Sequence, residues 1–445
     1  MSTLVLAQVL QASSKCVQGI FAGRSMATLL NDIQPDMRPA VQSVSYHAVR
    51  NLGFAIAVER LLISRPIRNA NVRSLLLVAI TLLDSALEAE VSGSTKRANN
   101  NAPIYTVYTL VDQAVRAAKG KLKPFKALIN ATLRNYIRQH HNLKNAALKS
   151  QEARYNYPMW WIKIIKQNYP EHWSSILSAG REHPPLVIRV NQRATSVNAV
   201  LEAFAADNIN AVHLKEQAIW LPEPLPVHVL PGFSEGWWSV QDYSAQLSAT
   251  LLPLKSGMKV LDACSAPGGK TSHMLEQADI SLLALDNVTE RLDRVRANLN
   301  RLNLLSDKVS LVCADAATPE NWWDGTQFDA VLADVPCTSS GVVRRNPDIP
   351  WLRRESDIND TAHAQYRILN ALWPLVAPGG YLLFASCSIF PQEGELQAKS
   401  FAQKNKNAHR LNAPGLILPL KQSGMPIAGD GFFYALFKKG GTNGA

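Results

Sequence analysis

The stretch Asp262-Ala-Cys-Ser-Ala-Pro-Gly-Gly-Lys-Thr271 decides the fold of the C-terminal half of this 445-residue chain. The apolar residues Met258, Val260 and Leu261 precede it, and a segment of helical character, 272–278, follows it. A strand, a Gly-rich turn and a helix in this order present backbone N–H groups and a helix N-terminus to a bound ligand. The sequence therefore predicts an α/β domain with a ligand site at this turn.

Three nucleotide-like cofactors compete for the turn. A dinucleotide fingerprint requires Gly-x-Gly-x-x-Gly, whereas Gly268 and Gly269 are adjacent. A P-loop requires a glycine five residues before its Gly-Lys-Thr, and Cys264 stands there. Both spacings fail. S-adenosylmethionine is the third candidate, and a tight turn that binds no ligand is the structural alternative.

The turn resembles the first motif of the RNA 5-methylcytosine methyltransferases, in which the second residue is usually alanine where this chain has Ser265. That resemblance implies S-adenosylmethionine as the cofactor. Asp286 ends the apolar run 282–285, where a carboxylate accepts hydrogen bonds from ribose hydroxyls, and Asp315 matches the family position near the adenine. The turn residues that the resemblance assigns to cofactor binding are Cys264, Ser265, Ala266, Pro267, Gly268, Gly269 and Lys270.

Composition excludes several classes of protein. A hydrophobic content of 47% excludes a largely disordered chain. The longest apolar run, near 75–83, is shorter than the ~20 residues that a membrane span needs. The apolar segment 4–10 is expected to be part of an amphipathic first helix rather than a signal peptide. The cysteines show no Cys-x-x-Cys or His pairing, which argues against a metal site and favours a reducing cytoplasm. Three of them are expected to pack their thiols in the core: Cys16, Cys264 and Cys313.

The net charge of +11 lies in the N-terminal third. Residues 1–150 hold 19 Lys+Arg against 7 Asp+Glu, whereas the remainder holds 27 against 28. This excess suggests a module that docks a polyanion, and ordinary solvated helix faces are the alternative.

Residues 1–147 predict an all-α domain, with a buried central helix at 75–87 and two last helices at 105–118 and 124–140. The segments 102–115 and 129–138 resemble the NusB-like helical RNA-binding domain. Basic side chains near its end are expected to contact phosphates without reading sequence. These are Arg116, Lys119, Lys121, Lys123, Lys126, Arg134 and Arg138.

Residues 148–235 predict a small α+β module. The segment 155–169 predicts a helix with an aromatic face, 186–190 a strand, 196–207 a helix, and 212–214 with 218–221 a strand pair. Such a unit before the catalytic domain is what the family resemblance implies.

Residues 236–445 alternate apolar strand candidates with helices, which predicts a largely parallel sheet covered on both faces. The resemblance implies a class I, Rossmann-like methyltransferase domain whose last strand is antiparallel. The expected helices are 271–278, 290–302 and 356–375. The expected strands are 259–262, 282–286, 309–313, 330–333, 381–385 and 432–437.

Two cysteines follow predicted strands, Cys337 in Asp334-Val-Pro-Cys and Cys387 in Ser-Cys-Ser. Methylation of cytosine at C5 needs a thiolate that adds to C6, because C5 in the aromatic ring is a poor nucleophile. Considered alone, each cysteine is more simply interpreted as a buried structural thiol. Spacing does not decide which of the two would be the nucleophile.

The stretch 334–348, followed by Ser-Cys-Ser at 386–388, resembles the two-cysteine arrangement of the RNA 5-methylcytosine methyltransferases. The resemblance implies that Cys387 is the nucleophile and that Cys337 assists release of the product. Asp334 is expected either to close the cofactor site or to accept a hydrogen bond from the cytosine amino group. We hypothesise that the nearby Lys270 lowers the pKa of the nucleophilic thiol.

A NusB-like domain fused to this methyltransferase resembles the branch of the family that modifies 16S rRNA, at cytosine 967. The expected partner is therefore 16S rRNA, with no membrane or metal, for a monomer in the cytoplasm. One alternative is methylation of tRNA or of another rRNA cytosine. Another is a non-catalytic NusB-like RNA-binding assembly factor.

Overall fold

The computed structural model describes residues 5–92, 105–420 and 429–441. The chain forms two compact units. Unit 1 contains residues 1–183 and 343–355, and unit 2 contains residues 184–342 and 356–445. The chain therefore passes between the units at three places. Among the described residues, no helix is both long and apolar enough to cross a bilayer.

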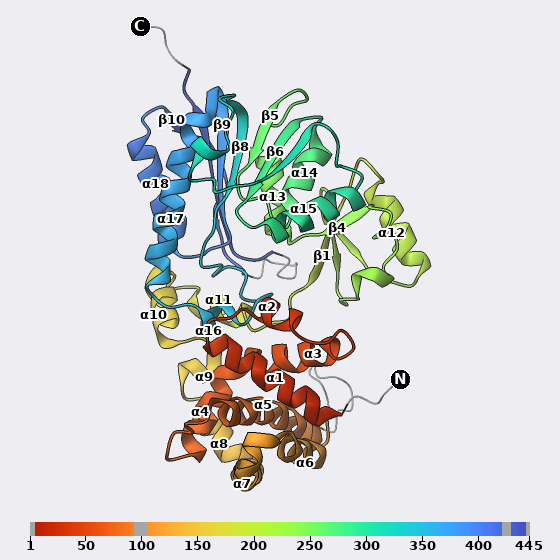
Figure 1. Cartoon of the computed structure of the whole chain (residues 1–445), viewed down its shortest axis with the longest axis vertical. Coiled ribbons are helices and arrows are strands. Elements are labelled where there is room, and N and C mark those ends of the chain that lie inside the picture. Colours follow the sequence, from red (N-terminus) through yellow and green to blue (C-terminus); the bar gives the residue numbers. More distant parts are fainter. Residues whose placement is uncertain (1–4, 93–104, 421–428, 442–445) are drawn as a thin grey trace. The chain divides into compact units, whose positions relative to one another are not determined.

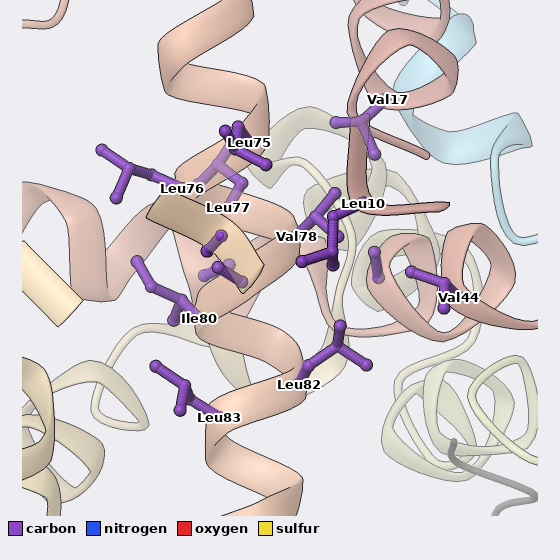
Figure 2. Packing of buried hydrophobic residues seen from close by; sticks show 14 of the residues in the cluster. Leu10, Val17, Val44, Leu75, Leu76, Leu77, Val78, Ile80, Leu82 and Leu83 are labelled. Carbon is purple, nitrogen blue, oxygen red and sulfur yellow. The ribbon is translucent and has the colours of Figure 1, made fainter. Parts of the chain in front are cut away.

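Unit 1 is helical and is built around α5, which is apolar on nearly all sides. Residues 75–80 of α5 are each at most 1% exposed. Figure 2 shows five of them, Leu75, Leu76, Leu77, Val78 and Ile80, beside Leu10, Val17 and Val44 of neighbouring helices. A helix that is hydrophobic all round must be enclosed by others, and this confirms the predicted central helix. The helices are α1 (Leu6–Phe21), α2 (Met26–Asn31), α3 (Arg38–Arg50), α4 (Leu52–Leu62), α5 (Ala70–Ser92), α6 (Val107–Ala117), η1 (Gly120–Phe125), α7 (Lys126–Arg138), α8 (His140–Ala147), α9 (Gln151–Tyr155), α10 (Met159–Asn168), α11 (Trp173–Ala179) and α16 (Ile349–Leu352).

The predicted helix 155–169 is shorter than expected. Asn156 adopts a left-handed conformation with φ 64° and ends α9, and Pro158 is the extended residue before α10. Because proline disfavours the helical conformation in the residue before it, α10 begins only at Met159.

Unit 2 begins with a small antiparallel sheet in the order β2-β3-β1-β4. Phe204 of α12 and Trp238 of β4 are fully buried in its core. The predicted strands 186–190 and 218–221 are confirmed. The elements are β1 (Leu186–Val190), α12 (Val197–Ala206), β2 (Val212–Lys215), β3 (Ala218–Leu221), η2 (Val227–Val229) and β4 (Trp238–Val240).

The large sheet of unit 2 has the order β10-β12-β9-β8-β5-β6-β7, with β11 paired to β12. Strands β9, β8, β5, β6 and β7 are parallel, whereas β12 is antiparallel to β9. This confirms the Rossmann-like α/β prediction. The strands are β5 (Lys259–Asp262), β6 (Ser281–Asp286), β7 (Val309–Cys313), β8 (Phe328–Asp334), β9 (Val376–Ser386), β10 (Ala408–Arg410), β11 (Gly415–Ile417) and β12 (Phe432–Lys439).

Helices cover both faces of this sheet (Figure 1). Alternate strand residues pack on opposite sides: Val260 faces α13, α14 and α15, and Leu261 faces α17 and α18. Period-2 alternation with apolar residues on both faces is expected of a doubly covered sheet. The helices are α13 (Tyr243–Leu251), α14 (Gly269–Gln277), α15 (Thr289–Arg301), η3 (Pro319–Asn321), α17 (Asp357–Leu372), η4 (Trp373–Leu375), η5 (Pro391–Glu393) and α18 (Glu395–Lys404).

The expected packing of three thiols is wrong for Cys313. Cys16 is buried and Cys264 is mostly enclosed, but Cys313 is exposed. Cys313 ends β7, which is an edge strand of the sheet. An edge strand is covered on fewer sides, and the sequence did not reveal which strand lies at the edge.

Candidate active site

The Gly-rich turn joins β5 to α14 as predicted. The N–H of Ser265 donates to the carbonyl of Leu285 at 2.7 Å, which fixes the turn against the next strand. Gly268 has φ +96°, and a Cβ there would lie 3.1 Å from a methyl carbon of Val295. Only glycine adopts this conformation without strain. The backbone between strand and helix is thereby held in one shape.

Two polar atoms under the turn are buried. Asp262 is 0% exposed, and its Oδ2 accepts a hydrogen bond from Thr271 Oγ1 at 2.7 Å. Its Oδ1 and the hydroxyl of Ser265 have no hydrogen-bond partner among the residues that the structure describes. Burial raises the pKa of Asp262 to about 7, the Thr271 hydrogen bond opposes the rise, and the charge of Asp334 adds to it. Buried groups without partners point to a ligand at the turn.

Asp286 ends β6, the neighbour of β5. Its side chain is buried, with 3% of the residue exposed. The carboxylate accepts hydrogen bonds from the N–H groups of Ala266, at 3.4 Å, and Val288, at 3.2 Å. It also forms an ion pair with the guanidinium of Arg291 at 3.3 Å. Asp315 follows β7 and is exposed, with its Oδ1 accepting from the N–H of Ala317 at 2.9 Å. Both acidic residues lie beyond the carboxyl ends of adjacent strands, where open α/β sheets bind ligands.

Arg189 of β1 was not predicted as a site residue. Its fully buried guanidinium forms a bidentate pair with Glu276 of α14, at 2.9 and 2.7 Å, and donates to the carbonyl of Gly269 at 2.8 Å. It also donates to Ser272 and Gln241. One side chain of the small sheet thus holds the turn and the first helix after it. Its position in an apolar strand was the one available signal, because a buried Arg requires partners.

Asp334, at the end of β8, and Lys270, from the turn, form an ion pair of 2.5 Å. Burial acts to lower the pKa of Lys270, but the Asp334 carboxylate outweighs this effect and the pKa is raised, with a smaller contribution from Cys387. Lys270 therefore remains a cation. The pair brings the cofactor turn and the Asp-Val-Pro-Cys motif together.

Cys337 and Cys387 meet, with 3.3 Å between their sulfur atoms. Cys337 follows β8 and Cys387 follows β9, and these adjacent parallel strands pair Asp334 with Ala385. The hydrogen bond between the sulfurs lowers the pKa of Cys337, against the effect of burial, and the same contact raises the pKa of Cys387. The pair therefore releases its first proton readily and retains its second.

Glu393 is a second residue that sequence reasoning missed. Its carboxylate is 0% exposed and accepts from the N–H of Thr338 at 2.7 Å, and from the hydroxyls of Thr338, Ser388 and Thr361 at 2.5 Å each. Thr338 follows Cys337, and Ser388 follows Cys387. One carboxylate therefore holds both cysteine loops. Its place in a polar turn gave no indication of burial.

Comparison with known proteins identifies the family. Residues 249–438 match the family model described as 16S rRNA methyltransferase RsmB/F, and residues 157–228 match the ferredoxin-like domain of the RsmF/B-like proteins. The ribosomal RNA small subunit methyltransferase B of Vibrio cholerae is 37% identical over 443 residues, covering 96% of each chain. The Escherichia coli protein of that name is 42% identical over 325 residues, covering 72% of this chain and 75% of that one.

Solved structures support the fold. The crystal structure of PH0851 has a TM-score of 0.72 at 21% identity and covers 99% of this chain and 100% of that one. A methyltransferase homologue from Pyrococcus horikoshii has a TM-score of 0.55 at 25% identity and covers 65% of this chain and 97% of that one. The sequence relatives and both family models show that this chain belongs to the 16S rRNA methyltransferase RsmB/F family.

Proposed function

We propose that the protein transfers a methyl group from S-adenosylmethionine to C5 of one cytosine of 16S rRNA, cytosine 967, through a covalent bond between Cys387 and C6. The observation that carries the proposal is the 3.3 Å approach of Cys337 and Cys387 beside the Lys270–Asp334 pair. Membership of a 16S rRNA methyltransferase family supports the substrate class.

The residues of the turn fit the proposed cofactor. The hydroxyl of Ser265, which has no hydrogen-bond partner among the described residues, provides a hydrogen-bonding group. The carboxylate of Asp286 suits a ribose diol, and Asp315 lies next along the same strand ends. A Cβ at Gly269 would lie 3.8 Å from Gln241 Nε2, an ordinary contact distance, so the backbone there is not closely covered. When bound, S-adenosylmethionine supplies an electrophilic methyl group on a sulfonium.

The cysteine pair supplies the nucleophile. Cys337, as the thiolate, takes the proton of Cys387 along the contact that already joins the two sulfurs. The Cys387 thiolate adds to C6, and electron density moves to C5, which then takes the methyl group. A base then takes the C5 proton, the electron pair of the C5–H bond re-forms the C5–C6 double bond, and the C6–S bond breaks to release the Cys387 thiolate. The resemblance gives Cys337 the role of assisting this release.

Asp334 and Lys270 orient the target base. An Asp carboxylate is the expected acceptor for the exocyclic amino group of cytosine, and the ion pair with Lys270 fixes its direction. The Lys270 cation also stabilises negative charge on the nearby sulfurs. The base must leave its stack to reach these groups.

The helical unit offers an RNA-binding surface. A groove of about 1170 Å³ between α6 and α7 is lined by Lys126, Arg134 and Arg138 and by Tyr108, whose side chain is 80% exposed. Cations next to an exposed aromatic ring suit a phosphate chain and a stacked base. Residues 1–147 form the proposed NusB-like RNA-binding domain, 148–235 the proposed linking module, and 236–445 the proposed catalytic domain.

The proposal is tested by methyl transfer from labelled S-adenosylmethionine to unmodified 16S rRNA or tRNA. We expect label at C5 of one 16S cytosine, loss of transfer in Cys387→Ala, and normal transfer in the control Cys313→Ala, which removes an exposed thiol. Label on tRNA alone would overturn the substrate. RNA binding without cofactor binding or transfer would instead indicate a binding protein.

A further inference from the structure

Helix α17 contacts the peptide group directly before Cys337. The Nε2 of Gln365, in α17, donates to the carbonyl of Pro336 at 3.0 Å. This carbonyl belongs to the peptide that links Pro336 to Cys337. Pro336 itself is exposed, so little packing holds this peptide in one orientation. The hydrogen bond from Gln365 therefore restrains the backbone that carries the Cys337 thiol.

The amide of Gln365 is buried at a cost. The residue is 0% exposed, and its Oε1 has no hydrogen-bond partner among the residues that the structure describes. A buried amide with an unpaired oxygen is less favourable than an apolar side chain of the same length. A buried polar group of this kind calls for a reason other than packing, and this amide donates to Pro336.

The helix that carries Gln365 is a firm support. Ile368 and Leu369, in its next turn, are buried in the same core as Val331 of β8. Gln397 of α18 donates to the carbonyl of Ala362 in α17 at 2.6 Å. The helix is thus held both by the large sheet and by the neighbouring helix.

The same face of α17 also acts on the residue after Cys337. Thr361 lies four residues before Gln365, and side chains four apart share one face of a helix. The Thr361 hydroxyl donates to Glu393 at 2.5 Å, and Glu393 accepts from the N–H of Thr338 at 2.7 Å. The chain is therefore restrained on both sides of Cys337, directly by Gln365 and through Glu393 by Thr361.

The Cys337 loop and α17 both belong to unit 2, whereas the segment 343–355 that joins them along the chain belongs to unit 1. In unit 1, Asp348 of this segment accepts from the N–H of Met26 at 2.8 Å, and Trp351 packs against the helical core. The contact between α17 and the Cys337 loop is thus made inside unit 2.

We propose that Gln365 is a positioning residue of the cysteine pair, which sets the Cys337 thiol at its distance from Cys387 by holding the Pro336 carbonyl. The effect on the distance between the thiols stands without the proposed function. The effect on methyl transfer rests on it.

Two variants change the donor and keep the size of the side chain. Gln365→Met removes the donor at every pH. Gln365→Glu places a carboxyl group there, which donates to Pro336 only while it is protonated. Burial raises the pKa of such a carboxyl, to ~8–9 in the extreme, so measurements between pH 5 and 9 span its titration.

Gln397→Met is the matched control. It removes a buried amide that also donates to a backbone carbonyl, but that carbonyl lies in α17 and not in the Cys337 loop. A role of Gln365 confined to stabilising α17 would give the two methionine variants the same effects. The midpoint of urea unfolding should fall no further in Gln365→Met than in Gln397→Met.

The first readout is oxidation of the thiol pair by diamide, with tryptic peptides mapped by mass spectrometry. The two thiols lose two electrons and two protons to diamide, form a Cys337–Cys387 disulfide and reduce diamide to its hydrazine. We expect Gln365→Met to slow this reaction about tenfold or more relative to wild type and Gln397→Met, since displacing a reacting group by ~1 Å can cost on the order of 100-fold. The rate of Gln365→Glu relative to wild type should fall as the pH rises.

Methyl transfer supplies the second readout. The kcat should fall in Gln365→Met, while the KM for S-adenosylmethionine stays within about twofold of wild type. Equal rates of disulfide formation in the two methionine variants, or no disulfide in the wild type, would overturn the inference. If Gln365→Met fails to fold, Gln365→Glu decides, and a relative rate that does not change with pH would overturn the inference. Slower oxidation in a protein that transfers no methyl group would support the inference and reject the proposed function.

Discussion

Glu393 binds Thr338 through both the backbone N–H, at 2.7 Å, and the side-chain hydroxyl, at 2.5 Å. The same carboxylate binds Ser388, so each cysteine is followed by a residue held by one buried acid. Charge-assisted hydrogen bonds of this kind are about twice as strong as neutral ones. The position of one thiol relative to the other therefore depends on a side chain that touches neither.

Replacing Glu393 by Gln should separate the two loops. The glutamine amide brings two N–H donors where the site presents donors already, and we expect a loss of about 1–3 kcal/mol in the free energy of unfolding. The kcat should fall by an order of magnitude or more, because the thiols lose their alignment. Glu395→Gln is the control, since its surface pair with Arg410 contributes less than about 1 kcal/mol. Equal effects of both substitutions in urea unfolding and methyl transfer would contradict this role.

Replacing Lys270 by Met should move the acidic limb of the pH–rate profile. The Lys270 cation favours the thiolate form of the nearby cysteines, so its loss should raise the pKa of the nucleophile. Activity should then fall at neutral pH and recover towards alkaline pH, while Lys270→Arg should keep the wild-type limb. Lys308→Met removes an exposed lysine that pairs with Asp279 and serves as the control. An unchanged limb in Lys270→Met would reject the idea.

Asp262 should make stability fall as the pH rises. Its pKa is about 7 in the folded protein against a usual value of 3.8, so the folded state binds the proton more tightly. The contribution is complete below pH ~4 and is lost as the pH passes through ~7, with a slope of at most about 1.4 kcal/mol per pH unit. Urea unfolding of wild type and Asp262→Asn between pH 4 and 8 measures it. The stability of wild type relative to the variant should decline across this range, and a flat or rising difference would contradict the shift.

Removing Arg189 should leave Glu276 as an unpaired buried charge. We expect Arg189→Met to cost about 3–5 kcal/mol in the free energy of unfolding, and Arg189→Met/Glu276→Leu to recover most of that loss. The double variant should still bind S-adenosylmethionine several-fold more weakly than wild type, because the carbonyl of Gly269 loses its donor. Equilibrium unfolding measures the stability of the variants, and calorimetric titration measures their affinity for S-adenosylmethionine. Wild-type affinity in the double variant would show that Arg189 supports the fold without positioning the turn.

The sequence was sufficient to predict six strands of the large sheet, because each of these is a short apolar run with a turn or helix on either side. The short strands β10 and β11 were not predicted, since three residues such as Ala408–Arg410 carry no apolar pattern. The acidic residues and cysteines at the strand ends followed from those boundaries, and the strands that carry Cys337 and Cys387 proved adjacent. Glu393 and Arg189 could not be found in this way. Each acts through partners far away along the chain, and neither the burial of a polar turn nor the pairing of a strand arginine is encoded in local periodicity.

The three passages of the chain between the units also have a consequence for protein synthesis. The helical unit holds residues up to His183 but is complete only when Glu355 has been made. Translation at ~5–20 residues per second separates these two events by roughly 10 to 30 s. Until then the N–H of Met26 and the apolar surface that receives Trp351 wait without their partners. We therefore expect the nascent helical unit to be a target for chaperones during this interval, and a gene fragment that ends near codon 183 to yield a less stable product than its predicted helices suggest.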